Sequence, residues 1–262
     1  MITSFILIKS NLQQVDDFES KINSLLTGEI LGVIFHDFYK TSECQSIVKN
    51  MTSQGFSWFN TKIDGYIGIG MPFFERSEIG REKYFLEIRN YQQLKKEIFS
   101  KYRSPTERIF DKFKPFFPFS VAVCNKYGEY YTDIIFAQKS RRNIHVDRVK
   151  YEFPKWNVAS IIRQFSSVVY FQVPEIGGAL EIFNRHWVNE DKALSKSPTR
   201  LELDDNLLQG VESLKYFPKI GELILFQTGF YHRVLDSLGD KHRISCNTFF
   251  GLEANGSVIF FV

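Results

Sequence analysis

Residues 167–183 read SVVYFQVPEIGGALEIF, and this stretch decides the fold class. Two runs of β-branched and aromatic side chains lie on either side of Gly177-Gly178, so the stretch predicts two short strands joined by a turn. Runs of the same kind predict further strands over 119–124, 130–137, 143–147, 222–227, 230–235, 243–250 and 257–261. Many short strands separated by turn signals predict a β-sandwich or barrel.

The first part of the chain is predicted to be mainly helical. A strand over 30–38 leads into a helix whose apolar residues recur at helical spacing, with Ser42 and Gln45 as its expected capping box. Further helices are expected over 88–102 and over 105–114, where Ser and Pro open the second of them.

The fold class predicted from these patterns is α+β. We expect a single domain over residues 1–262, in which a helical N-terminal layer, residues 1–118, packs on a β core, residues 119–262. Residues 184–217 are polar with helix-compatible pieces and are expected to form a long insertion. Long loops in compact domains are often functional lids, so this insertion is a candidate lid.

The composition is that of an ordinary globular protein. Of the 262 residues, 44% are hydrophobic and 24% charged, and the 27 Phe and 12 Tyr predict an aromatic core. The net charge is only +3, from 33 basic and 30 acidic residues that are interspersed. No basic stripe tracks a phosphate backbone, so no nucleic-acid partner is expected.

The cysteines and the N-terminus indicate a cytoplasmic protein. Cys44, Cys124 and Cys246 lie far apart and form no C-x-x-C pair, so we expect buried, reduced thiols. The apolar run at 5–8 is too short for a signal sequence or a membrane span, so no membrane association is expected.

One group of residues carries chemistry. His145 and Asp147 are two residues apart on a predicted strand, and side chains at this spacing point to the same face. His232, in GFYHRV, is the candidate third ligand from a neighbouring strand. Two histidines and one carboxylate form the facial triad of non-haem Fe(II) oxygenases, which leaves coordination positions open for a co-substrate and O2.

A candidate carboxylate anchor follows on the next predicted strand. Arg243 lies eleven residues after His232, and its planar guanidinium can clamp a carboxylate. Ser245 lies two residues further on the same face and can add a hydroxyl, and Asn247 can line the same pocket.

The order of these motifs resembles that of the 2-oxoglutarate/Fe(II) oxygenase superfamily. The resemblance rests on HVD (145–147), GGALEIF (177–183), PKIGELILF (218–226), the histidine of FYH (230–232) and RIS (243–245). The resemblance covers about residues 119–251, and within the superfamily the order and spacing of the motifs are similar to those of the prolyl-hydroxylase-type branch. It implies a double-stranded β-helix (jelly-roll) core, the cofactors Fe(II), 2-oxoglutarate and O2, and a place for Tyr170 on the distal carboxylate of 2-oxoglutarate.

The same motifs also look like the standalone amino-acid and alkaloid halogenases and their hydroxylase relatives. The halogenases of that group replace the metal-binding carboxylate with Gly, which opens a site for chloride. Asp147 is present here. The resemblance therefore implies hydroxylation or another oxidation of an unactivated C–H bond, with release of succinate and CO2.

The sequence leaves open the identity of the substrate and the roles of several residues that could line its pocket. The favoured substrate is a free amino acid or specialised metabolite, and the alternatives are a protein or peptide hydroxylase of the prolyl type and a non-catalytic β-barrel binding module. Tyr151, Phe153 and Trp156 can line a substrate pocket, although packing explains them equally well. Arg163 can bind an acidic substrate group at the pocket mouth. The oligomeric state is not predicted.

The remaining histidines are His36, His186 and His242, and they are interpreted as ordinary hydrogen-bonded side chains.

Overall fold

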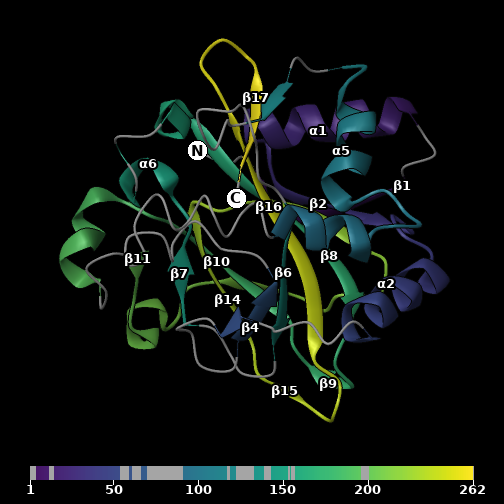
Figure 1. Cartoon of the computed structure of the whole chain (residues 1–262). Coiled ribbons are helices and arrows are strands. Elements are labelled where there is room, and N and C mark those ends of the chain that lie inside the picture. Colours follow the sequence, from purple (N-terminus) through teal and green to yellow (C-terminus); the bar gives the residue numbers. More distant parts are fainter. Residues whose placement is uncertain are drawn as a thin grey trace.

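The structure is a computed structural model, which describes residues 4–11, 15–53, 59–60, 66–69, 91–116, 119–121, 133–138, 143–152, 154, 157–195 and 201–261. Its core is two β-sheets that face each other, with helices over the outer face of the larger sheet (Figure 1). This arrangement confirms the expected mixture of helices and many strands.

The large sheet has ten strands, in the order β1-β2-β13-β8-β16-β6-β4-β3, with β17 and β5 continuing from β16. The strands are β1 (Ser4–Asn11), β2 (Ile30–His36), β13 (Leu223–Gln227), β8 (Arg163–Gln172), β16 (Arg243–Leu252), β6 (Ile134–Gln138), β4 (Tyr66–Ile69), β3 (Phe59–Asn60), β17 (Val258–Phe261) and β5 (Phe119–Val121). The strand pairs from β2 to β4 are antiparallel. Antiparallel strands of alternating pattern can present one face to each of two layers.

The small sheet has five strands, in the order β11-β7-β14-β10-β12. They are β11 (Leu201–Glu202), β7 (His145–Val146), β14 (Phe230–Val234), β10 (Leu180–His186) and β12 (Ser213–Tyr216). A two-stranded ribbon, β9 (Ile176–Gly177) and β15 (Ser237–Leu238), lies apart from both sheets. Gly177 and Gly178 both have positive φ, which glycine adopts readily. They lie in the connection between β8 and β10, where Gly177 belongs to the strand β9, so the connection is longer than the simple turn that was expected.

The space between the two sheets is filled by a compact apolar cluster. The large sheet contributes side chains such as Val168, Ile224 and Phe226, and the small sheet contributes Ile182 and Phe230. Alternate residues of each strand point into this layer, as the period of a strand requires. The neighbouring polar side chains of the same strands therefore lie at the edge of a dry interior.

Helices cover the other face of the large sheet. They are α1 (Val15–Thr27), α2 (Thr41–Ser53) and α5 (Pro105–Phe113), and residues 91–98 are also helical. Their apolar faces join Phe165, Phe171 and Phe250 of the sheet in the largest hydrophobic cluster. The shorter helices are α6 (Val149–Glu152), η2 (Asn157–Ser160), η3 (Asn189–Leu194) and η4 (Asp205–Leu208).

The N-terminal part of the chain is not a purely helical layer. β1 and β2 pair in parallel, and β2 also pairs with β13, so this part also supplies one edge of the large sheet. The apolar run at 5–8 lies on β1, which the sequence analysis missed. The division of a single domain near residue 118 stays a prediction.

The first predicted helix cap is wrong and the second is confirmed. The Glu43 carboxylate accepts a hydrogen bond of 2.7 Å from the Lys40 backbone N–H, so α2 begins before the expected Ser42–Gln45 box. The Ser104 backbone N–H donates to Glu107 at 2.8 Å, as the Ser-Pro pattern predicts.

The predicted insertion also differs from expectation. Within residues 184–217, β11 pairs with β7 and β12 pairs with β10, so the segment provides both edges of the small sheet. The described part of the segment also contains the short helices η3 and η4, and its role as an insertion and a lid stays a prediction.

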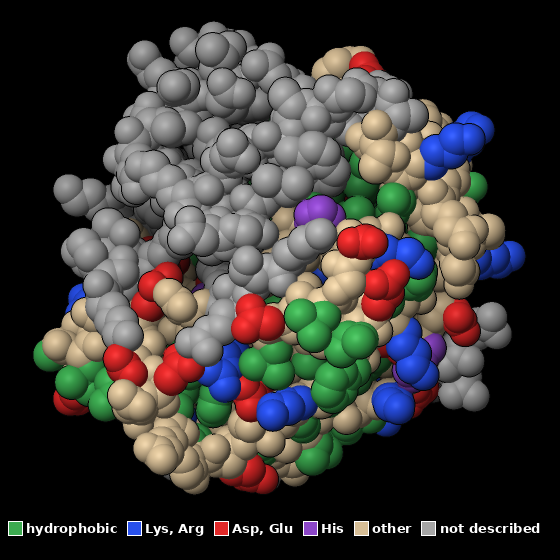
Figure 2. All heavy atoms as spheres, turned by 90° about the horizontal axis from the view of Figure 1, so that it is seen from below, with side chains coloured by type: hydrophobic (Ala, Val, Ile, Leu, Met, Phe, Trp, Pro, Cys, Tyr) green, Lys and Arg blue, Asp and Glu red, His purple; other side chains and the backbone are tan. Residues whose placement is uncertain are grey.

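The surface carries charges of both signs. Figure 2 shows basic, acidic and hydrophobic side chains intermixed over the described part of one face. No helix in the described part of the chain is long and apolar enough to cross a membrane.

Candidate metal centre

The three predicted ligands come together on the small sheet. His145 lies on β7, and His232 lies directly opposite it on the antiparallel strand β14. Their ring centroids are 4.3 Å apart. Asp147 follows β7 and points to the same side as His145, because the two residues are two apart on an extended chain.

The distances between these side chains suit one small cation. Asp147 Oδ2 lies 3.2 Å from His232 Nε2, and Asp147 Oδ1 lies 3.9 Å from His145 Nε2. One potential ligand atom from each residue lies within 4.8 Å of the other two. Ligand atoms about 2.1 Å from one ion and at right angles to each other are about 3 Å apart, so small side-chain rotations would complete the shell.

Hydrogen bonds to the backbone orient both imidazoles. His145 Nδ1 lies 2.7 Å from the Asn143 carbonyl oxygen, and His232 Nδ1 lies 2.9 Å from the Phe230 carbonyl oxygen. A carbonyl oxygen can only accept, so each Nδ1 must carry the proton and donate. In the neutral imidazole the lone pair is then on Nε2, which faces Asp147. This is the tautomer that a metal-binding histidine requires.

The backbone around Asp147 is also fixed. Its N–H donates to the Thr228 carbonyl oxygen at 3.2 Å, and the Thr228 hydroxyl donates to the Asp147 carbonyl oxygen at 2.9 Å. Thr228 belongs to the turn between β13 and β14, which also leads into His232. The same turn therefore positions the carboxylate and the second histidine. The donor set, two neutral imidazoles and one carboxylate, fits an Fe(II) ion.

Arg243 is buried in the same interior. Its Nη1 donates to Gln138 Oε1 at 2.8 Å and its Nη2 to the Tyr170 hydroxyl at 3.4 Å. Its Nε–H has no hydrogen-bond partner among the described residues. A guanidinium held from two sides, with a donor left over, is suited to bind a carboxylate. Gln138 on β6 was missed by the sequence analysis, because nothing in the pattern marks a glutamine at the end of a strand.

Of the other two predicted pocket residues, Tyr170 contacts Arg243, and Ser245 lies next to Tyr170 in the sheet. Tyr170 on β8 and Ser245 on β16 are opposite each other in the sheet register, and both are buried. The Arg243 guanidinium carbon lies 5.0 Å from the centre of the Tyr170 ring. Asn247 lies on the same strand face, opposite Val168.

Tyr216 on β12 is a second tyrosine near this pocket, and the sequence analysis missed it. Its ring centroid lies 6.0 Å from that of Tyr170, and its hydroxyl donates to Glu222 Oε2 at 2.5 Å. Burial, followed by the neighbouring Tyr170 and Glu222, raises the pKa of Tyr216 above its ordinary value. His36 Nδ1 lies 2.6 Å from the other oxygen of Glu222, which makes His36 a hydrogen-bonded sheet histidine as predicted.

The remaining predicted residues lie elsewhere. Arg163 and His186 line a separate cavity, which is not lined by the three metal-ligand candidates. Tyr151 packs against Trp187, with ring centroids 4.2 Å apart, which fits the packing interpretation. Phe153 and Trp156 are outside the described residues. Cys44 and Cys246 are buried free thiols, as expected, and Cys124 is outside the described residues.

Comparison with known proteins identifies this arrangement. The family model of the carrier-protein-independent halogenase WelO5 matches residues 4–262. No protein of curated function matches the chain.

Two solved structures share the fold over almost the whole chain. An N-substituted L-amino acid dioxygenase from Burkholderia ambifaria, solved with α-ketoglutarate, has 14% sequence identity and a TM-score of 0.58, with 94% of this chain and 92% of that chain covered. An oxidoreductase of the 2OG-Fe(II) oxygenase family from Burkholderia pseudomallei has 13% identity and a TM-score of 0.50, with 97% and 98% covered. The expected jelly-roll core is thereby confirmed.

The chain belongs to the WelO5 family of 2-oxoglutarate- and Fe(II)-dependent enzymes, and its cofactors are Fe(II), 2-oxoglutarate and O2.

Proposed function

We propose that this enzyme hydroxylates, or otherwise oxidises, an unactivated C–H bond of a small molecule, with release of succinate and CO2. In this proposal His145, Asp147 and His232 hold the iron, and Arg243 anchors the distal carboxylate of 2-oxoglutarate. Tyr170 and Ser245 complete the anchor. The whole chain acts as one catalytic domain.

The observation that carries the proposal is the carboxylate of Asp147, 3.2 Å from His232 Nε2. The halogenases that the sequence resembles have glycine at this position and bind chloride in the space. A carboxylate in that space supplies the third protein ligand and leaves no room for a halide at the same coordination position. This favours oxygen transfer to the substrate over halogen transfer.

The residues around the centre divide the work of binding and orientation. The two Nδ1 hydrogen bonds direct the imidazole lone pairs toward one point before a metal arrives. Arg243 is held by Gln138 and Tyr170, so it presents a fixed donor array to the far end of the co-substrate. Fixed donors reduce the orientational freedom of a bound dicarboxylate.

The reaction needs a dry site. Iron with bound 2-oxoglutarate supplies, on reaction with O2, the oxidising power to break a C–H bond. Ile182, Ile224 and Phe226 of the apolar cluster lie in the same layer between the sheets and limit the access of water. Exclusion of water suppresses side reactions of the activated site.

A free amino acid or specialised metabolite is the proposed substrate class. Support comes from the likeness in fold to the N-substituted L-amino acid dioxygenase, which acts on an amino acid. A peptide hydroxylase of the prolyl type is the alternative, and a substrate screen that includes proline-containing peptides distinguishes the two.

The test is substrate-triggered release of succinate. The protein is loaded with Fe(II) and 2-oxoglutarate without oxygen, exposed to amino acids, metabolite extracts and peptides, and then supplied with O2. We expect succinate above the uncoupled background with at least one small molecule and a product heavier by one oxygen atom. Near-normal succinate release by an Asp147→Ala variant would refute the ligand assignment.

The reaction type has a separate test. Asp147→Gly reproduces the halogenase residue, and we expect it to give a chlorinated product when chloride is present, whereas the wild-type protein gives none. A chlorinated product from the wild-type protein would overturn the proposed hydroxylation.

A further inference from the structure

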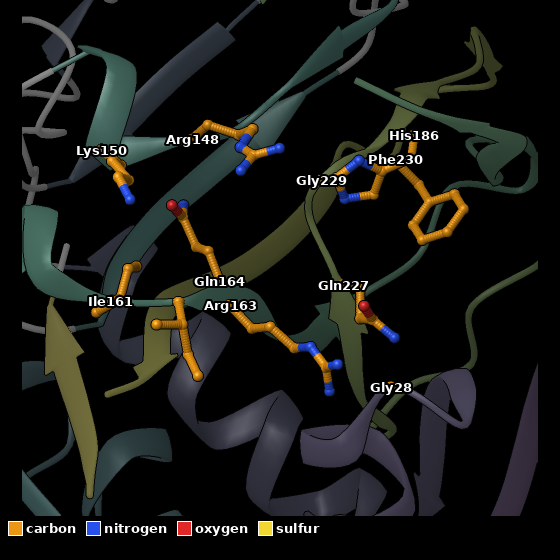
Figure 3. Close-up of a pocket in the computed structure, with 11 residues that line it drawn as sticks. Gly28, Arg148, Lys150, Ile161, Arg163, Gln164, His186, Gln227, Gly229 and Phe230 are labelled. Carbon is orange, nitrogen blue, oxygen red and sulfur yellow. The ribbon is translucent and has the colours of Figure 1, made fainter. Parts of the chain in front are cut away.

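The cavity that contains Arg163 and His186 has three cationic side chains in its lining. Its volume is about 240 Å³, and its cationic lining residues are Arg148, Lys150 and Arg163 (Figure 3). Binding sites for drug-sized ligands measure about 300–1,000 Å³, so this cavity suits a small ion or one end of a larger molecule. No Asp or Glu is among its described lining residues.

Arg148 is held in the cavity wall without an opposite charge. Its guanidinium carbon lies 4.9 Å from the ring centres of both Tyr151 and Trp187. These rings orient the guanidinium but accept no hydrogen bond from the N–H groups that lie in the guanidinium plane. No carboxylate among the described residues pairs with it.

Arg163 enters the cavity from the start of β8. Its Nη1 donates to the Leu26 carbonyl oxygen at 2.6 Å. A Cβ at Gly28 would lie 2.8 Å from the same Nη1, so glycine leaves the room that the guanidinium needs. One backbone carbonyl fixes the side chain and neutralises none of its charge.

Gln164 adds a neutral donor to the same wall. Its Oε1 accepts a hydrogen bond of 2.8 Å from the Val149 backbone N–H. Because a backbone N–H can only donate, the oxygen is the atom bound to Val149, and the NH2 group remains for another acceptor.

The lining also includes three apolar side chains, Ile161, Ile162 and Phe230, and Ile162 is 56% exposed. His186 also lies in the lining, and burial lowers its pKa, as does the nearby Arg148.

The cavity is separate from the 2-oxoglutarate anchor. Neither Arg243 nor any of the three metal-ligand candidates lines it. It is nevertheless adjacent to the centre along the chain, because Arg148 follows Asp147 and Phe230 precedes His232 by two residues.

We propose that this cavity binds an oxyanion, such as a carboxylate, sulfate or phosphate group, through Arg148, Arg163 and the NH2 group of Gln164, with Lys150 at its rim. Like charges around one cavity repel each other, and an anion in their midst removes that repulsion and satisfies the guanidinium donors. The anion is either a group of the substrate or a separate ion.

The test uses sulfate as the probe on the full-length protein. The protein is loaded with redox-inert Ni(II) and saturating 2-oxoglutarate, so that the metal centre and Arg243 are occupied, and sulfate is titrated by calorimetry. We expect saturable binding of one sulfate per chain. Arg148→Gln and Arg163→Gln each weaken binding at least tenfold, because each removes a charge-assisted hydrogen bond.

Lys112→Gln is the matched control, because it removes one positive charge from an exposed position on α5. We expect its sulfate affinity to equal that of the wild-type protein. Arg163 also supports the turn at Leu26, so Arg148→Gln keeps the test valid if Arg163→Gln folds poorly. Absence of saturable binding, or equal affinities in Arg148→Gln and Lys112→Gln, would overturn the proposal.

Kinetics then separate the two sources of the anion. If the anion is part of the substrate, sulfate competes with the substrate identified in the screen and raises its KM. If it is a separate ion, sulfate changes the maximal rate without competition. The sulfate titration does not depend on turnover, so failure of the oxygenase proposal and failure of this site are distinguishable.

Discussion

Asp133 and Asp147 are both carboxylates in polar clusters that the fold buries, and they differ in their partners. Asp133, at the start of β6, is fully buried on the helix-covered side of the large sheet. Its Oδ2 lies 2.5 Å from Lys95 Nζ, and its Oδ1 accepts from the Thr106 backbone N–H at 2.9 Å and from the Thr106 hydroxyl at 2.7 Å. Asp147 instead faces two imidazole Nε2 atoms.

The difference separates a structural carboxylate from a metal ligand. Burial alone would raise the pKa of Asp133, but the Lys95 ammonium and the Thr106 hydrogen bonds outweigh it and hold the pKa below its usual value. Asp133 therefore has its charge balanced within the chain. Asp147 and the two imidazoles form a donor set that suits a cation from solution.

The largest expected effect is on turnover. Asp147→Ala should lower substrate-dependent succinate formation about a thousandfold or more, equivalent to roughly 4 kcal/mol, because one of three ligands is lost. The free energy of unfolding of the metal-free protein should change by less than about 1 kcal/mol. Asp111→Ala, at an exposed ion pair with Arg103, is the control and should retain activity. A large loss of stability in Asp147→Ala would show that Asp147 is a structural carboxylate, like Asp133, and not a metal ligand.

The opposite pattern is expected at Asp133. Asp133→Ala should lower the free energy of unfolding by about 3–5 kcal/mol, because Lys95 would lose its counter-charge in a low-dielectric environment. A denaturant titration of the metal-free protein measures this. Adding Lys95→Met should recover part of the loss, since it removes the stranded ammonium. If the single variant is as stable as the wild type, Asp133 is not the structural anchor described here.

Arg243 gives a smaller, selective effect. Arg243→Gln should raise the KM for 2-oxoglutarate roughly ten- to hundredfold, because a charge-assisted hydrogen bond contributes about 1.5–3 kcal/mol. Arg103→Gln, which removes an exposed guanidinium, should leave this KM unchanged. An unaltered KM in Arg243→Gln would exclude it as the anchor.

The smallest effect is on acid stability. The pKa of Asp133 is lower in the folded protein than in the unfolded chain, so its contribution is complete above the unfolded value of about 4 and is lost as the pH falls through the folded value. The stability difference between wild type and Asp133→Asn should therefore be constant from about pH 5 to 8 and narrow below about pH 4. Chemical denaturation across this range measures it, and a difference that grows on acidification would contradict the assigned charge.

Part of this molecule could be predicted from the sequence because local patterns encode it. The i, i+2 spacing of His145 and Asp147 fixes a shared side of an extended chain, and this needs no knowledge of distant residues. The pairing of His232 with His145 depends on sheet register, which the sequence predicts only as far as placing His232 on a neighbouring strand.

Other parts depend on contacts between distant segments. Gln138 becomes a partner of Arg243 only through the register of β6 on β16, and Lys95 meets Asp133 only when the helices dock on the sheet. The strand β12 was not predicted, because four residues carry too short a pattern to distinguish a paired strand from a polar loop.

The pairing of β11 with β7 has a mechanical consequence. Glu202 lies opposite His145, and the Leu203 backbone N–H donates to the Ile144 carbonyl oxygen at 3.1 Å. On the other histidine strand, the hydroxyl of Tyr231, the neighbour of His232, donates to Asp191 at 3.0 Å. A displacement of Asp191 or Glu202 would therefore move the strand that carries His232 or His145. The visible absorption of a Co(II) ion bound by the two imidazoles would report this movement.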